Sequence, residues 1–383
     1  MTNNKDKKVL NVPNLRFPEF TGEWKKERLD EIAELSKGIG ISKEQLSSNG
    51  NPCILYGELY TKYKSEIISE VISKTNIEKN KLKHSKQNDV IIPCSGETAV
   101  DIAVARCVPF DNVLLGGDLN IIRLHKYDGA FMAYQLNSKR KIEIAKLAQG
   151  VSVVHLYGEN LKSINTFNPS LQEQQKIVRL LSLLDERIKV QNKIIEKLKS
   201  LIKGIAQHCI KELTSGNTYV KLGDICQITT GKLDANAQVD NGIYPFFTCA
   251  EQPFKIDSFA FDTEALLISG NGANLGYINY YKGKFNAYQR TYVLDLFSEN
   301  IQYIKWALKV LLPKRIAIEK SSSNTPYIVL STLTDLRLPI PCKSKQSFIA
   351  NLMQSLERKL SNQIAQYDSY NYLKQYLLRQ MFI

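Results

Sequence analysis

The sequence has few residues of the kinds that hold metal ions or form disulfide bridges. Its 383 residues include only seven cysteines and four histidines. No Cys-x-x-Cys pair occurs, the odd number of cysteines cannot pair fully within one chain, and the histidines stand apart at positions 84, 125, 155 and 208. These absences argue against a metal centre and a disulfide-stapled domain, and they favour reduced, buried thiols.

Long apolar stretches are also lacking. No uninterrupted run approaches the roughly 20 apolar residues of a membrane span. Even the most apolar helical segment, around residues 306–312, contains Lys309. The charged residues that follow Met1 lack the apolar core of a secretory signal. The sequence therefore predicts a cytoplasmic protein.

Motifs for nucleotide chemistry are missing as well. There is no Gly-x-x-x-x-Gly-Lys-Ser/Thr loop to hold phosphates, and residues 51–54, Asn-Pro-Cys-Ile, do not match the Asn/Asp-Pro-Pro-aromatic motif of methyl transfer. The glycine-rich segment 270–276 lacks the spacing of a dinucleotide loop and indicates a turn. Acid-x-Lys triplets such as residues 23–25 arise by chance in a chain with many charges. We expect no catalytic centre, no metal site and no bound cofactor in this chain.

The charge that is present is mainly positive. Lys and Arg number 51 against 38 Asp and Glu, a formal net charge of +13, which attracts polyanions and makes nucleic acid the leading partner class. A basic but otherwise ordinary protein would carry the same charge, so composition leaves both interpretations open. With 43% hydrophobic and 23% charged residues the composition is globular, and the length indicates two or three domains.

A long internal repeat is the most informative feature of the sequence. Residues 29–38 match residues 222–231 at an offset of 193, and Pro52 and Pro245 keep that offset. Later matches have an offset of 172, so the second copy is 21 residues shorter. These later pairs are Leu124 with Leu296, Leu161 with Leu333, Ile164 with Leu336, Pro169 with Pro341, Gln174 with Gln346, and Ile177 with Ile349.

Each copy combines strand-like and helix-like segments, which predicts the α+β class for both globular heads. Residues 89–96 and 264–270 are short apolar runs that end in glycine, as buried strands do, whereas 131–147 and 301–312 have helical spacing. We expect the heads and helices to alternate in tandem. The expected limits are a first head over 1–167, a long helix over 168–213, a second head over 214–340 and a second long helix over 341–383.

Both long helices carry a coiled-coil seam, with apolar residues at alternating steps of four and three. Ser170 and Glu173 fit a capping box at the start of the first helix, whereas Lys345 replaces the glutamate in the second and predicts a weaker cap. Gln191 and Gln363 occupy equivalent seam positions and either fix the register or reach water. Pairing within the chain would bury both seams at once. The seam positions are Ile177, Leu181, Leu184, Ile188, Gln191, Ile195, Leu198, Ile349, Met353, Leu356, Leu360 and Gln363.

Two segments resemble signatures of the specificity subunits of type I restriction-modification systems. Residues 13–24 resemble the entry to the first target-recognition domain, and residues 168–177 resemble the start of the central helix. With the duplication, the resemblance spans nearly the whole chain. It implies that each head reads one half of a split target in double-stranded DNA, and that two antiparallel helices act as spacer and docking surface for two methyltransferase subunits. It also implies restriction subunits as partners, with S-adenosylmethionine, ATP and Mg²⁺ bound by the partner subunits.

Candidate DNA contacts lie in both heads. Gln and Arg have the donor geometry to read adenine or guanine edges, whereas Lys more often contacts phosphates, and the glycines of 270–276 would let the backbone approach a phosphate closely. A solvated surface charge is the simpler explanation for any one of these residues, but as a set some should contact DNA. The set is Lys37, Lys43, Lys62, Lys232, Lys282, Lys284, Gln289 and Arg290.

Three other functions remain as alternatives: a stand-alone duplicated DNA-binding regulator, a coiled-coil scaffold with incidentally basic heads, and a self-sufficient restriction enzyme. The missing motifs argue against the enzyme. The length of the resemblance argues against the other two. The sequence therefore favours a non-catalytic recognition subunit.

Overall fold

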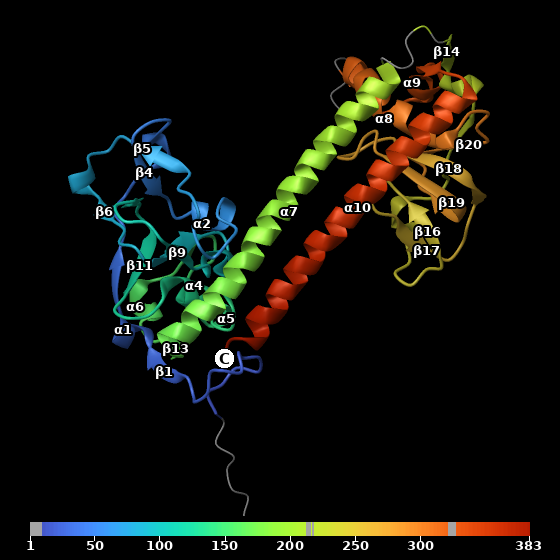
Figure 1. Ribbon diagram of the computed structural model, residues 1–383. Coiled ribbons are helices and arrows are strands. Elements are labelled where there is room, and N and C mark those ends of the chain that lie inside the picture. The colour runs from blue at the N-terminus through green and yellow to red at the C-terminus, as the bar shows by residue number, and fades with distance from the viewer. Residues whose placement is uncertain (1–9, 212–215, 217, 321–326) are drawn as a thin grey trace, which may run out of the picture. The chain divides into compact units, whose positions relative to one another are not determined.

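The computed structural model describes residues 10–211, 216, 218–320 and 327–383 (Figure 1). The chain divides into two compact units. The first comprises the chain up to Asn192 together with Gln366–Ile383, and the second comprises Lys193–Ala365. The division cuts across the expected head and helix limits, because each long helix contributes one part to each unit.

Each unit is built on a sheet whose strands are mainly antiparallel and come from separate parts of the chain. In the first unit the strand order is β2 (Ala33–Lys37), β11 (Leu119–Leu124), β7 (Asp89–Pro93) and β9 (Arg106–Val108). In the second unit the order is β15 (Gln227–Thr230), β20 (Thr291–Asp295), β18 (Phe261–Ser269), β19 (Ile278–Ala287), β16 (Tyr244–Phe247) and β17 (Phe254–Ile256). The apolar runs at 89–96 and 264–270 thus form buried strands, as predicted.

The strand registers of the two units are equivalent, which confirms the duplication. Lys37 pairs with Asn120 and Thr230 with Tyr292, so the partners differ by the offsets 193 and 172. The same offsets relate the pair β1 (Lys25–Arg28) and β13 (Asn165–Asn168) to the pair β14 (Thr218–Lys221) and β21 (Arg337–Ile340). A repeated sequence pattern has therefore given a repeated hydrogen-bond ladder.

Part of the length difference between the copies lies next to a parallel strand pair that both contain. Strand β4 (Asn51–Ile54) pairs with β10 (Leu114–Leu115) as β16 pairs with β19. In the antiparallel pairs that follow, Asn51 meets Thr75, 24 residues on, whereas Tyr244 meets Ile256, 12 residues on. The extra residues of the first copy hold the short helix α2 (Glu58–Thr61).

The first unit contains further short elements. Its second sheet has the order β3 (Leu46–Ser47), β5 (Ser73–Thr75), β4, β10 and β6 (Lys83–His84), and β8 (Ser95–Gly96) pairs with β12 (Val154–His155). Its short helices are α1 (Leu29–Ile32), α3 (Ala99–Ile102), α4 (Gly129–Asn137), α5 (Lys141–Lys146) and α6 (Gly158–Leu161). The second unit adds α8 (Ile301–Lys320) and α9 (Leu330–Thr334). The expected helix over 131–147 is therefore two helices separated by a break at 138–140.

Two long helices run through the repeats: α7 (Leu171–Lys211) and α10 (Lys343–Gln380) (Figure 1). In the first unit, α7 buries Leu181 in the same apolar cluster as Leu377 near the end of α10. In the second unit, α7 buries Ile202 in the same cluster as Ile349 near the start of α10. The helices therefore pack antiparallel, which confirms the expected coiled-coil arrangement.

The seam positions differ in how far they are buried. Gln191 is buried, with 6% of its surface exposed, so the explanation that it reaches water does not fit it. The other buried positions are Ile177, Leu181, Leu184, Ile195, Leu198, Ile349 and Met353. The half-buried positions are Ile188, Leu356, Leu360 and Gln363. The seam of the second helix is therefore more exposed to solvent than that of the first.

Candidate nucleic-acid interface

Three of the predicted DNA contacts meet around one turn of the second unit. Gln289 and Arg290 are exposed in the turn between β19 and β20. The Gln289 backbone N–H donates to the Leu233 carbonyl at 2.9 Å, so Lys232, the preceding residue, lies beside this turn. The Gly270 N–H donates to the Arg290 carbonyl at 2.8 Å, which brings in the glycine-rich loop. Amide and guanidinium donors thus share one exposed surface beside the glycine-rich loop.

Lys282 and Lys284 lie on β19, where their cross-strand neighbours on β18 are acidic. Lys282 Nζ is 3.7 Å from the Glu264 carboxylate, although 72% of the lysine side chain is exposed. Lys284 Nζ lies 4.5 Å from the centre of the Phe259 ring. Both ammonium groups are exposed enough to contact a phosphate, but Glu264 partly balances the charge of Lys282.

The three lysines predicted in the first head have different surroundings. Lys37 ends β2 and lies 5.8 Å from the Tyr157 ring centre, and Lys43 is exposed in a short 3₁₀ turn. Lys62 Nζ lies 2.7 Å from the buried carboxylate of Glu58 and also donates to Ser73 Oγ at 3.3 Å. Its charge therefore compensates a buried acid, which is a structural role.

The equivalent turns of the two heads carry different side chains. The shared register places Gly117 and Asp118 of the first head where the second has Gln289 and Arg290. The Asp118 carboxylate accepts a hydrogen bond from Ser95 Oγ at 3.2 Å. One turn therefore offers hydrogen-bond donors and the other an acceptor, so the two heads differ in hydrogen-bonding character at equivalent places.

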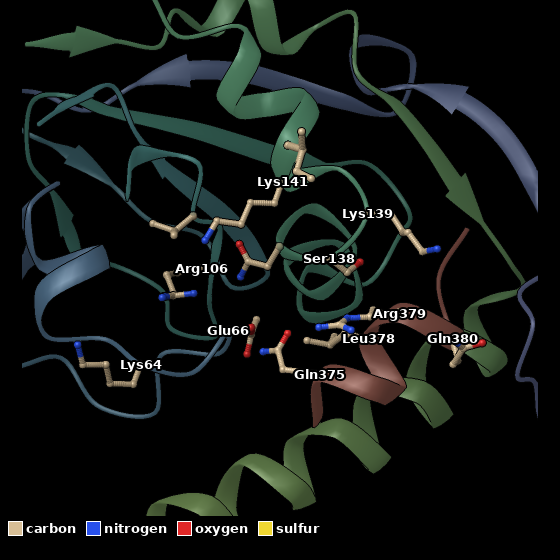
Figure 2. Close-up of a pocket in the computed structure, with 13 residues that line it drawn as sticks. Lys64, Glu66, Arg106, Ser138, Lys139, Lys141, Gln375, Leu378, Arg379 and Gln380 are labelled. Carbon is tan, nitrogen blue, oxygen red and sulfur yellow. The ribbon is translucent and has the colours of Figure 1, made fainter. Parts of the chain in front are cut away.

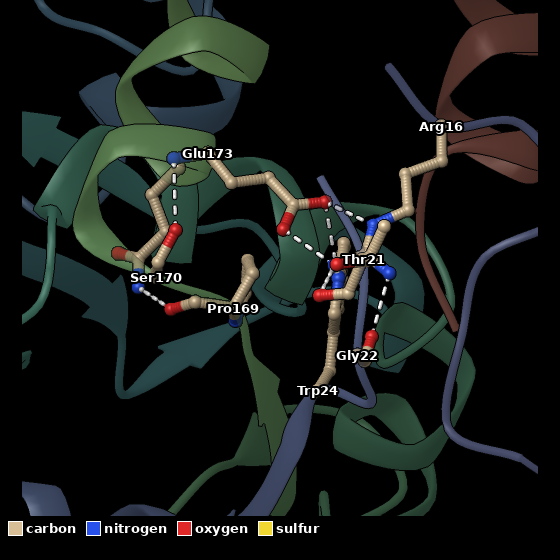
Figure 3. Close-up of polar contacts among 8 residues, drawn as sticks. Arg16, Thr21, Gly22, Trp24, Pro169, Ser170 and Glu173 are labelled. Atoms are coloured by element: carbon tan, nitrogen blue, oxygen red, sulfur yellow. Dashed lines mark hydrogen bonds and ion pairs between the residues drawn. The ribbon is translucent and has the colours of Figure 1, made fainter. Parts of the chain in front are cut away.

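The two segments that carry the family resemblance meet at the start of α7 (Figure 3). The guanidinium of Arg16 donates to both carboxylate oxygens of Glu173 at 2.7 Å, and Trp24 Nε1 donates to the same carboxylate at 3.2 Å. The hydrogen bond to Glu173 raises the pKa of Arg16 above its usual value. Both Trp24 and Glu173 are 1% exposed. This junction fixes the segment before β1 against the long helix.

The junction corrects one prediction about the helix start. Ser170 Oγ accepts from the Glu173 N–H at 3.3 Å, as a capping box requires, but the Glu173 carboxylate binds Arg16 and Trp24 rather than the backbone. The prediction that the Glu173 carboxylate caps the backbone at the helix start is therefore wrong. In the second copy Lys345 stands at the position equivalent to Glu173.

A glutamine holds each helix start in the same way. Gln174 Nε2 donates to the Pro169 carbonyl at 2.8 Å, and its Oε1 accepts from the Asp128 N–H at 2.9 Å. Gln346 Nε2 donates to the Pro341 carbonyl at 2.9 Å, and its Oε1 accepts from the Asn300 N–H at 3.0 Å. These residues were not predicted as structural, although their shared offset of 172 was visible in the sequence.

A buried ion cluster joins α10 and α7 to the first head. Lys374 Nζ lies 2.6 Å from both the Glu66 and the Asp185 carboxylates, and Tyr134 donates to Asp185 at 2.7 Å. Burial alone would lower the pKa of Lys374, but the two carboxylates outweigh it and raise the pKa. The cluster therefore ties together four segments that are far apart in the sequence.

Two buried thiols and the acidic side chains show no sign of a chemical centre in the part of the chain that the structure describes. Burial raises the pKa of the Cys53 and Cys94 thiols to about 11, so neither is a thiolate at neutral pH. Among the described residues, no three His, Cys, Asp or Glu side chains gather as ligands for a metal ion. Nor does any described helix combine the length and apolar character needed to cross a membrane.

Comparison with known proteins places these features in one family. The profile of the Type I restriction modification DNA specificity domain matches residues 21–200 and 214–367. The chain is 44% identical over 137 residues to the type I restriction enzyme EcoDI specificity subunit of Escherichia coli, a match that covers 36% of this chain and 30% of that subunit. It is 23% identical over 385 residues to a putative type I specificity subunit of Mycoplasma genitalium, covering 94% of each chain.

The fold has a counterpart among solved structures. The crystal structure of a type I restriction-modification S subunit from M. genitalium matches with a TM-score of 0.67 and 20% sequence identity. The match covers 97% of this chain and 99% of that one. At this identity the likeness concerns the fold.

Proposed function

The chain belongs to the type I restriction-modification DNA specificity family, and on that premise we propose that it selects the target for methyltransferase and restriction subunits. Each head reads one part of a split site in double-stranded DNA. The long helices set the separation of the two parts and receive the partner subunits. This chain makes and breaks no covalent bond in the reaction.

This proposal rests on one observation: the two heads have equivalent strand registers, but their equivalent turns carry different side chains. Equivalent backbones place Gln289 and Arg290 in one head and Gly117 and Asp118 in the other. Arg and Gln suit guanine and adenine edges, whereas an acidic side chain can accept from the cytosine amino group. Two related heads with different donors and acceptors suit a target whose halves differ in sequence.

An apolar stripe on α7 supports helix docking of the partners. Leu183, Val190, Ile194 and Leu201 are spaced by seven, four and seven residues, which keeps them on one face, and each is more than 40% exposed. The seam residues occupy another face of the same helix. On α10, Tyr372 and Tyr376 are also exposed, at 76% and 48%. Exposed apolar side chains at regular helical spacing are typical of a surface that another protein covers.

The catalytic cofactors belong, on this proposal, to the partners. Two methyltransferase subunits would bind S-adenosylmethionine, and restriction subunits would bind ATP and Mg²⁺. The absent phosphate-binding and methyl-transfer motifs support this division of labour. The complex would act in the cytoplasm, where DNA is available.

Methylation mapping tests the proposal directly. Co-expression of the chain with its methyltransferase subunits should methylate adenines at one two-part sequence throughout the host genome. The purified chain alone, with S-adenosylmethionine, Mg²⁺ and ATP supplied, should neither methylate nor cleave DNA. Activity of a preparation shown to be free of partner subunits would refute the recognition-subunit function.

A further inference from the structure

The first unit contains a polar pocket that the proposed function does not use. It has a volume of about 620 Å³ and lies where the last turns of α10 meet the break between α4 and α5 (Figure 2). Ligand sites for small molecules fall in the range of roughly 300–1,000 Å³. The pocket is therefore large enough for a small organic or inorganic ligand.

The pocket lining is strongly cationic. It includes Lys64, Arg106, Lys139, Lys141 and Arg379. Glu66 is the one carboxylate in this lining, and it is already paired with Lys374 at 2.6 Å. Across the described residues, the four surface cations of the pocket have no ion-pair partner. The lining therefore has an excess of positive charge that the protein itself does not balance.

Arg106 adds a buried donor to this lining. The residue is 7% exposed, and its two terminal nitrogens donate to backbone carbonyls, to Ala105 at 3.2 Å and to Tyr63 at 3.0 Å. Its Nε is buried and has no hydrogen-bond partner among the described residues. Burial lowers the pKa of this guanidinium, although Glu66 and Asp185 act in the opposite direction. A buried polar group without a partner is rare and is commonly satisfied by a ligand or water.

Two of the cationic side chains approach each other in the pocket, and the others lie around them. In Figure 2 the Lys141 ammonium points toward Arg106, and Lys64 and Lys139 stand on opposite sides of the group. Leu378 and Val104 supply apolar wall. We propose that this pocket binds a small polyphosphate, of the size and charge of a triphosphate, as a ligand that the chain holds without converting it.

A short phosphate chain fits the shape and charge of this pocket better than duplex DNA does. Its oxygens can enter a concave site and accept from several cations at once, whereas phosphates of a duplex stay on a wide, stiff surface. Only Glu66 could offer a carboxylate to Mg²⁺ here, and Lys374 already occupies it. The ligand would therefore be bound by direct charge-assisted hydrogen bonds.

Calorimetric titration of the full chain with sodium tripolyphosphate tests this inference. We expect one site per chain, with an affinity that falls as salt rises. Lys141→Ala combined with Arg379→Ala should weaken binding by roughly tenfold or more for each cation removed. Lys146→Ala is the matched control, because Lys146 is also an exposed lysine of α5 but does not line this pocket, and it should leave the affinity unchanged.

Several outcomes would overturn the inference. Equal weakening in the control and the double variant would mean that any basic surface holds the anion. Binding of adenosine as tight as that of tripolyphosphate would mean that phosphates do not carry the interaction. If the double variant bound a target duplex more weakly to the same degree, the pocket would be part of the DNA surface. Lys64→Ala changes a single exposed residue of the lining and should lower the affinity for tripolyphosphate less than the double variant does. This second variant keeps the test valid if the double variant does not fold.

These results are separable from the proposed function. The genomic methylation pattern of the double variant should match that of the original chain. A changed target sequence in the double variant would mean that these cations contact DNA, and would overturn the inference. Failure of the unaltered chain to direct methylation to a two-part sequence, with its tripolyphosphate binding intact, would count against the proposed function and not against the pocket.

Discussion

One equivalent pair of glycines, one in each repeat, is required by the close approach of two backbones. A Cβ added at Gly38 would lie 1.9 Å from the Gly116 carbonyl oxygen, and one added at Gly231 would lie 1.8 Å from the Ala287 carbonyl oxygen. The two glycines are equivalent under the offset of 193. The match between residues 29–38 and 222–231 thus ends on a glycine because the fold leaves no room there for a side chain.

We expect Gly231→Ala to destabilise the second head by about 1–3 kcal/mol, because the carbonyl must move away from the new methyl group. Gly204→Ala is the matched control: this glycine lies in α7 with open space around it, and the change should stabilise the helix by up to about 1 kcal/mol. Thermal unfolding of the two variants measures both effects. A Gly231→Ala protein as stable as the control would refute the close approach.

The exposed polar residues of the second head should divide by role. Gln289→Ala with Arg290→Ala should relax the sequence preference in one half of the target, since these donors suit base edges. Lys282→Ala with Lys284→Ala should weaken binding of the assembled complex to all sequences alike and lower the salt slope by roughly 0.9 for each phosphate that is no longer neutralised. The affinity of each variant complex for target and unrelated duplexes, measured over a range of salt concentrations, separates these two roles. A changed target with an unchanged slope in the lysine variant would mean that these lysines read bases.

At the scale of elements, the ion cluster at Lys374 holds α10 to the first head. Lys374→Ala leaves two buried carboxylates without a counter-charge, and we expect the free energy of unfolding to fall by about 3–5 kcal/mol. Lys359→Ala, an exposed lysine of the same helix, should change stability by less than about 0.5 kcal/mol. Denaturant unfolding, followed by the spectroscopic signal of the helices, measures the change in stability of both variants.

A combined variant isolates the charge effect from the packing effect. Adding Glu66→Gln and Asp185→Asn to Lys374→Met should recover most of the stability, because no unpaired buried charge remains. Failure of this rescue would mean that shape rather than charge makes Lys374 important. An equal destabilisation in Lys374→Ala and Lys359→Ala would show that the cluster contributes nothing.

The helices show how far a pattern predicts an element. Apolar spacing predicted both long helices and the seam side chains, since a helix buries whichever face carries its apolar residues. It did not predict the partner of Glu173, because that carboxylate binds Arg16 and Trp24, about 150 residues away in the chain. The more polar and aromatic residues of the second seam did predict its lower burial, and Leu356 and Leu360 are only half-buried.

At the scale of the whole molecule, helix length should set the distance between half-sites. Recognition elements on one face of a duplex lie about one helical turn apart, near 10 base pairs. Inserting one heptad after Lys193 and another after Ala365 keeps the seam and adds about 10 Å, or roughly three base pairs. We expect the methylated sites to keep their half-site sequences and to acquire a longer spacer.

The insertion also rotates the preferred site around the duplex, so overall methylation should fall even where the spacer lengthens. A single insertion in α7 is the control: it puts the two seams out of step and should destabilise the chain. An unchanged spacer in a folded, active double-insertion variant would mean that contacts outside the helices set the distance, and the spacer role would have to be abandoned.

By itself the sequence determined the duplication, the α+β heads, the paired long helices and the family, because these depend on local periodicity and on matches along the chain. It also predicted Lys232, Gln289 and Arg290 as a basic and amide-bearing set, although their common turn became visible only in the structure. Folding decided the Arg16–Glu173 junction, the Lys374 cluster and the cationic pocket with Arg106. Their members are separated by up to about 300 residues and share no motif, since burial and charge balance in three dimensions selects them rather than spacing along the chain.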